Sequence, residues 1–113
     1  MEPQTQTQDL NLLYKQTIDA QRQHLLELQT QFNEKCDVIK VEAKKRIGGA
    51  APEDSGARDQ ALTWQKAELE KALAWLKTAV HESTRDTMKK LEEVQRKREA
   101  QLLTSIETQI QSL

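Results

Sequence analysis

Residues 58–113 read RDQALTWQKAELEKALAWLKTAVHESTRDTMKKLEEVQRKREAQLLTSIETQIQSL. Apolar side chains return in this segment every eleven positions, at Leu69, Val80, Leu91, Leu102 and Leu113. Eleven residues make three turns of α-helix at about 3.67 residues per turn, so the repeat keeps one apolar stripe on one side of a long helix with a slight right-handed drift. We therefore predict a helix over residues 58–112, whose stripe the rest of the chain has to cover.

The first part of the chain carries the same repeat. Tyr14, Leu25, Cys36 and Ile47 follow one another at eleven-residue steps. Two helices with a common repeat can lie along each other in one register, so we expect a helix over residues 9–47 that packs against the later one. Residues 1–8 are polar and low in complexity, and we predict that they form a flexible tail.

A cluster of glycines marks the turn between the two predicted helices. All three glycines of the chain, together with Pro52, fall within residues 48–56. Gly48 and Gly49 are predicted to end the earlier helix, and Asp54 or Ser55 to cap the later one. We therefore assign residues 48–57 to the turn.

Residues 81–87, HESTRDT, leave the continuity of the second helix open. Ser83, Thr84 and Asp86 are able to end one helix and cap another, which would give a three-helix bundle. However, the eleven-residue step from Val80 to Leu91 continues across this segment, which contains no glycine or proline. We expect one continuous helix, because a loop has no reason to preserve the step.

Size and composition favour a small all-α domain with a narrow core. The chain has 113 residues, of which 36% are hydrophobic, 31% are charged and only four are aromatic. The formal net charge of −1 excludes a strong global attraction to nucleic acid or to an anionic membrane. A single cysteine excludes a disulfide within the chain and suits a reducing compartment, so we expect a cytoplasmic protein.

Laid out as an antiparallel hairpin, the two predicted helices differ in length. A turn centred near residue 53 places Leu10 near Arg96 and Ile47 near Asp59, so the last turns of the second helix have no partner from the first. These turns carry apolar side chains on one face, at Leu102, Leu103, Ile106, Ile110 and Leu113. Exposed apolar surface costs on the order of 25 cal/mol per Å². We expect oligomerisation or a docked partner to cover this face, and a frayed terminus is the alternative.

The two tryptophans lie beside the predicted stripe and not on it. At 100° per residue, Trp64 and Trp75 project roughly 220–240° away from Leu69, and Val38 projects toward the same side of the hairpin from the first helix. Either the indole rings cover the seam between the two helices, or two hairpins associate into a four-helix bundle that buries Trp64, Trp75 and Val38. Together with the apolar C-terminal face, this pattern favours a homodimer.

Catalytic and ligand-binding patterns are missing from the sequence. His24 and His81 project to opposite flanks of the hairpin, without the glutamates of a di-metal bundle, and Cys36 reads as a small core residue. Gly48 and Gly49 are not followed by the Lys-Ser or Lys-Thr of a phosphate-binding loop. We expect no metal, no cofactor, no small-molecule substrate and no enzymatic activity.

The sequence therefore predicts a coiled-coil-like helical hairpin that dimerises and binds protein, as an adaptor, scaffold, secretion-related or regulatory module. The alternative is peripheral binding to a lipid or another hydrophobic surface through the tryptophans and the C-terminal leucines. Nucleic-acid binding has less support, because the basic clusters in residues 35–46 and 85–98 are interleaved with acidic side chains.

Overall fold

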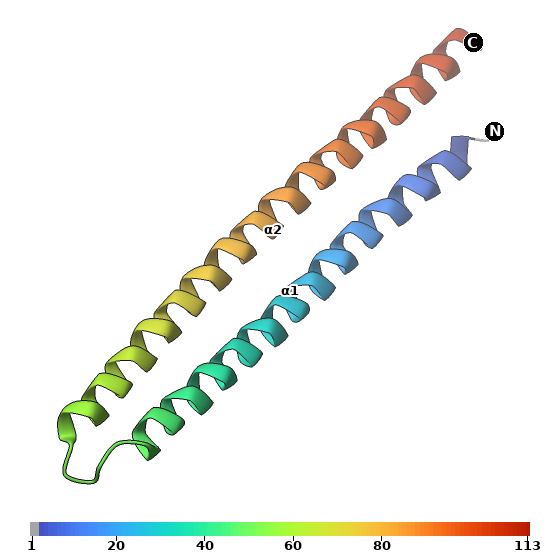
Figure 1. The fold of residues 1–113 in the computed structure, drawn as a ribbon. Helices are drawn as coiled ribbons and strands as arrows, with labels where there is room; N and C mark the ends of the chain where they lie inside the picture. Colours follow the sequence, from blue (N-terminus) through green and yellow to red (C-terminus); the bar gives the residue numbers. More distant parts are fainter. Residues whose placement is uncertain (1–2) are drawn as a thin grey trace. The chain divides into compact units, whose positions relative to one another are not determined.

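The computed structural model describes residues 3–113, and the side chains from Asp9 onward. Within these residues the protein is all-α and has no strand: α1 spans Pro3–Gly48 and α2 spans Ser55–Gln111 (Figure 1). The predicted fold class, a hairpin of two long antiparallel helices, is confirmed. Of the predicted N-terminal tail, residues 1 and 2 lie outside the described part, whereas residues 3–8 already belong to α1.

The turn between the helices is shorter than the sequence suggested and covers residues 49–54. The Gly49 amide donates a hydrogen bond to the carbonyl of Lys45 at 2.9 Å, and the Ala50 amide donates to the carbonyl of Ile47 at 3.1 Å. These bonds satisfy carbonyls that the end of α1 would otherwise leave open. Asp54 caps α2, because its Oδ1 accepts a hydrogen bond from the Ala57 amide at 2.9 Å.

Helix α2 runs without interruption through residues 81–87, as the eleven-residue step predicted. The three-helix alternative is therefore wrong. Ser83 and Thr87 do not cap a helix end here. Their hydroxyl groups lie in the seam between α1 and α2, where both donate hydrogen bonds to Gln21.

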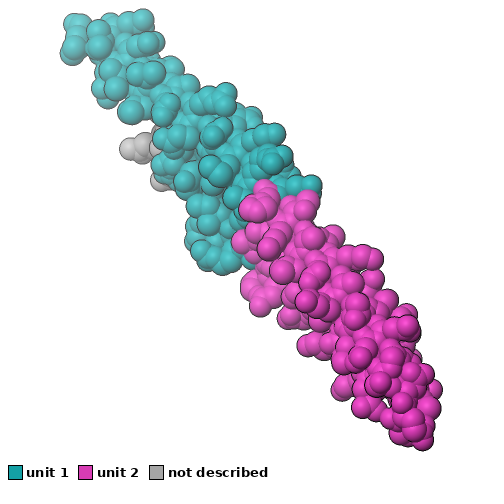
Figure 2. All heavy atoms as spheres, turned by 90° about the vertical axis from the view of Figure 1, so that its left-hand side faces the viewer, with its two compact units in different colours: residues 1–24, 82–113 teal, residues 25–81 magenta. Residues whose placement is uncertain are grey.

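The chain divides into two compact units (Figure 2). Unit 2, residues 25–81, holds the turn and the helical segments on either side of it, and unit 1 combines residues 1–24 with residues 82–113. Each unit is a pair of antiparallel helical segments. The predicted layout places Gln21 opposite residue 85, and in unit 1 Gln21 contacts Ser83 and Thr87 on either side of that position. The antiparallel register is therefore close to the predicted one.

On α1, the seam follows the predicted repeat. Tyr14, Leu25, Cys36 and Ile47 are all half-buried. Leu28 and Ala43 are the most deeply buried side chains of this helix. The eleven-residue step therefore identified the inner face of α1 correctly.

On α2, the centre of the seam differs from the prediction. The most buried residues are Ala61, Ala72, Ser83 and Val94, which also follow one another at eleven-residue steps. Of the predicted stripe, Leu69, Val80 and Leu91 are half-buried beside this line, whereas Leu62 and Leu73, seven residues before and four residues after Leu69, are 48% and 42% exposed.

The reason for this difference is steric. The side chains at the centre of the seam lie where the two helix axes approach most closely, and small residues allow the larger side chains of the other helix to enter. The register that sets Gln21 against Ser83 also sets Phe32 against Ala72, eleven residues further along each helix. The leucines of α2 are displaced to one edge of the seam as a result.

Candidate functional site

The C-terminal part of α2 presents a row of exposed apolar side chains in unit 1. Four of its side chains are 42% to 63% exposed and the terminal leucine is fully exposed; we call this set the C-terminal stripe, and it consists of Leu102, Leu103, Ile106, Ile110 and Leu113. In Figure 1, α2 continues past the start of α1, so no residue of α1 lies beside its last turns. The stripe contains the residues that the sequence predicted to be a docking face.

One side of unit 2 is formed by the two tryptophans and by cations of α1. The guanidinium carbon of Arg46 lies 3.8 Å from the centre of the Trp64 ring, and the Nζ of Lys35 lies 4.7 Å from the centre of the Trp75 ring. Both distances fit cation–π interactions. The two pairs repeat at an eleven-residue step on each helix, so they form a regular ladder along this side of the seam.

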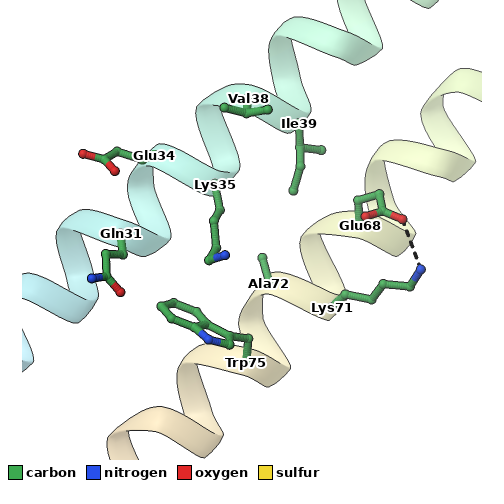
Figure 3. Close-up of a pocket in the computed structure, with 9 residues that line it drawn as sticks. All are labelled: Gln31, Glu34, Lys35, Val38, Ile39, Glu68, Lys71, Ala72 and Trp75. Carbon is green, nitrogen blue, oxygen red and sulfur yellow. Dashed lines mark hydrogen bonds and ion pairs between the residues drawn. The ribbon is translucent and has the colours of Figure 1, made fainter.

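An open groove of about 600 Å³ lies beside this ladder. Figure 3 shows Lys35 pointing toward the Trp75 ring. Lys71 and Glu68, which form an ion pair at 3.1 Å, also line the groove. Val38, at 69% exposed, lies on the rim of the groove and does not contribute to the core. In the single chain the two rings lie against cations of α1, and their burial together with Val38 between two hairpins stays a prediction.

The opposite side of unit 2 carries a second groove, of about 460 Å³, which we call the Cys36 groove. Its apolar lining comes from both helices, and its rim carries two lysines and one glutamate; the lining residues used below are Phe32, Cys36, Leu62, Leu69 and Leu73. Cys36 is half-buried, and it is the only cysteine of the chain. The sequence did not identify this groove, because the leucines that line it were assigned to the seam.

Unit 1 contains a polar cluster in the seam between its two helical segments. The Oε1 atom of Gln21 accepts hydrogen bonds from the hydroxyls of Ser83 and Thr87, each at 2.6 Å. The Nδ1 atom of His24 lies 2.8 Å from the Oγ of Ser83, and the amide of Gln21 reaches Thr84 at 3.4 Å. The sequence analysis did not predict this cluster. Gln21 and Ser83 do lie one eleven-residue step from Phe32 and Ala72, so the repeat places them in the seam.

A hydrogen-bonded serine and histidine raise the question of nucleophilic chemistry. Ser83 donates a hydrogen bond to the Oε1 of Gln21, and the Nδ1 of His24 lies 2.8 Å from the same serine oxygen. Ser83 is 7% exposed, and the cluster lines one side of an open groove of about 430 Å³. The cluster is suited to fixing the register of the two helices, because a buried polar layer is satisfied in one alignment only.

No set of three or more His, Cys, Asp or Glu side chains within the described residues is arranged to hold a metal ion. Likewise, neither helix, over the part of the chain that was searched, has a segment long and apolar enough to cross a membrane. Comparison with protein-family models, with curated proteins and with solved structures finds no match for this chain. The surfaces described above are therefore the basis for a functional assignment.

Proposed function

We propose that this protein is a non-enzymatic protein-binding module that acts as a homodimer of helical hairpins. The observation that carries the proposal is the C-terminal stripe. Its exposed fractions add up to about three fully exposed aliphatic side chains. Burying each one stabilises an assembly by roughly 1.5 to 3 kcal/mol, so the stripe contributes about 5 to 10 kcal/mol per copy. This is comparable with the cost of association, which is about 4 to 15 kcal/mol.

The thin core of the hairpin supports the same proposal. Within the described residues only five apolar side chains are buried, three of them alanines, and no large side chain is fully enclosed. A two-helix hairpin has no third layer to cover its remaining apolar surface. Association with a second hairpin supplies that layer in the form of a four-helix bundle.

Peripheral binding to a lipid surface has weaker support. That function would insert Trp64 and Trp75 into the hydrophobic layer, but both rings are covered by cations of the same chain. Flotation with phosphatidylcholine and phosphatidylserine vesicles separates the two functions. Recovery of most of the protein with the vesicles would favour the lipid surface over the homodimer.

The proposal is tested by charging the stripe. The double substitution Ile106→Asp and Ile110→Asp places two carboxylates on the stripe, and we expect the mass in solution to fall from that of a dimer to that of a monomer. The matched control is Thr104→Asp with Thr108→Asp, which adds the same charges at the same spacing on another face of α2. Light scattering gives the mass, and circular dichroism checks that helicity is retained. A dimer that survives the first pair unchanged would argue against the stripe as the interface.

A further inference from the structure

Four exposed charged residues share one face of α2 in unit 2, and we call them the charged row: Asp59, Lys66, Glu70 and Lys77. They are separated by seven, four and seven residues, which places them within about 40° of one another around the helix. The spacing is the same from either end, and the charges alternate from negative to positive along the row. Within the described residues, none of the four takes part in an ion pair of its own chain.

We infer that the charged row is a second self-association surface, at which the α2 helices of two copies lie antiparallel. The two-fold axis passes beside Glu68, midway along the row. Lys66 of one copy then faces Glu70 of the other, Asp59 faces Lys77, and the symmetry forms each pair twice. The contact lies within unit 2 and does not use the C-terminal stripe, so it goes beyond the proposed function.

The same alignment brings exposed leucines together at the edge of the Cys36 groove. Leu62 and Leu73 line this groove next to the charged row, and they are 48% and 42% exposed. Leu62 of one copy lies within one residue of the position that faces Leu73 of the other, and the two copies of half-buried Leu69 lie near the axis. The contact therefore covers apolar side chains that the single chain leaves open, beside a row of ion pairs.

This alignment keeps like charges apart. Glu68, beside the axis, lines the groove on the tryptophan side and pairs with Lys71, so it points away from the contact. Arg58 projects about 100° away from Asp59 around the helix, so Asp59 is the residue that faces Lys77.

The alternation of charge favours a second copy over another partner. A helix that fits the charged row has to carry the opposite signs at the same spacing of seven, four and seven residues. A reversed copy of α2 supplies that pattern. A parallel copy would instead set each charge of the row against its own duplicate, so the antiparallel alignment is the one that the charges select.

The contact is weaker than the one proposed for the C-terminal stripe. Leu62 and Leu73 together expose about as much surface as one free leucine, against about three for the stripe. We expect a Kd on the order of 0.1 to 1 mM for this contact alone, so a stripe-charged variant is still monomeric in dilute solution. A chain with a two-fold contact at each of two surfaces assembles beyond a dimer at high concentration, and this last step rests on the proposed homodimer.

The experiment is disulfide trapping at high protein concentration. The background is Cys36→Ser with Ile106→Asp and Ile110→Asp, which removes the only native thiol and disables the C-terminal stripe. Leu62→Cys and Leu73→Cys variants, one carrying a size tag, should form a mixed covalent dimer when they are mixed and oxidised, because paired cysteines need Cα atoms within about 7 Å. Either variant oxidised alone should give at most about a tenth of that yield, because its two thiols would lie roughly 15 to 18 Å apart along the helix axis.

Charge exchange in the same assay tests the ion pairs. Lys66→Glu in both partners should lower the trapping yield about three- to tenfold, because it sets a carboxylate against Glu70 twice. Lys66→Glu in one partner with Glu70→Lys in the other should restore the yield to within about threefold, because every facing pair again has opposite charges. The matched control is Lys89→Glu in both partners. It makes the same change of net charge at an exposed position outside the charged row, and it should leave the yield within about twofold of the original.

Two outcomes would overturn this contact. One is a mixture that traps no better than the single variants, and the other is a Lys66→Glu effect no larger than that of Lys89→Glu. The proposed function is judged separately, from the mass of the wild-type and stripe-charged proteins in dilute solution. A failure there leaves the trapping result as it stands, because trapping is carried out with the stripe already charged.

Discussion

The Oγ of Ser83 lies 2.6 Å from the Oε1 of Gln21, across the seam between α2 and α1 in unit 1. On both sides of this bond along α2, the corresponding positions of the repeat are apolar, at Ala72 and Val94. A sliding of the helices by one eleven-residue step, which is three turns, would bury the amide of Gln21 against apolar side chains, at a cost of about 1 to 3 kcal/mol. The Gln21 cluster therefore favours one register over the others.

The first prediction concerns this cluster. Gln21→Leu should lower the free energy of unfolding by about 1 to 3 kcal/mol, because Ser83 and Thr87 lose the acceptor of their hydroxyl protons in the seam. The triple variant Gln21→Leu, Ser83→Ala, Thr87→Val should recover that stability, since both hydroxyls in the seam are removed with their acceptor, and His24 and Thr84, which also lose a partner, are exposed to solvent. Urea unfolding followed by circular dichroism at fixed protein concentration measures both. If the triple variant is as unstable as Gln21→Leu alone, the loss of these hydrogen bonds is not the cause.

The second prediction tests the centre of the seam. Ala72 is buried and Ala74, two residues later on the same helix, is exposed. Ala72→Leu should lower the free energy of unfolding by about 1 to 3 kcal/mol through overpacking, whereas Ala74→Leu should change it by less than about 0.5 kcal/mol. The measurement is again the urea midpoint of each variant. Equal stability of the two variants would mean that Ala72 does not lie at the centre of the seam and that the leucines of α2 do.

The main features of the fold follow from periodicity alone. An eleven-residue step in both halves of the chain and a glycine cluster between them are sufficient for two helices, a turn after Gly48 and an antiparallel register near that of Gln21 with Ser83. These features depend on chain geometry, which the spacing of apolar residues encodes directly.

The orientation of α2 about its own axis could not be read from apolar spacing. Leu62 and Leu73 weigh heavily in any angular average of hydrophobicity, but such an average does not separate a face that packs within the chain from one that is left for a partner. Ala72 and Ser83 contribute little to the average, although small size is what the closest approach of the helices requires. The cations over Trp64 and Trp75 belong to α1, so the pattern of residues within α2 could not predict these contacts.

The third prediction concerns the tryptophan ladder. Arg46→Gln should lower the free energy of unfolding by about 0.5 to 1 kcal/mol when Trp64 is present, because the guanidinium lies over that ring. In a Trp64→Leu background the same change should have a smaller effect, limited to the exposed ion pair of Arg46 with Glu42 at 3.3 Å. The difference between the two backgrounds, a double-mutant cycle, isolates the cation–π contribution. A difference of zero would mean that Arg46 and Trp64 are not coupled in solution.

The fourth prediction concerns the last residue of α1. No glycine within the described residues has a positive φ, and a Cβ atom added at Gly48 would meet nothing within 4 Å. Gly48→Ala should therefore stabilise the protein by about 0.4 to 1 kcal/mol, because alanine restricts the unfolded chain without straining the folded one. At Gly49 the added Cβ would lie 3.4 Å from the carbonyl oxygen of Lys45, so Gly49→Ala should stabilise the protein less. A urea midpoint that falls for Gly48→Ala would mean that the end of α1 needs a left-handed residue in solution.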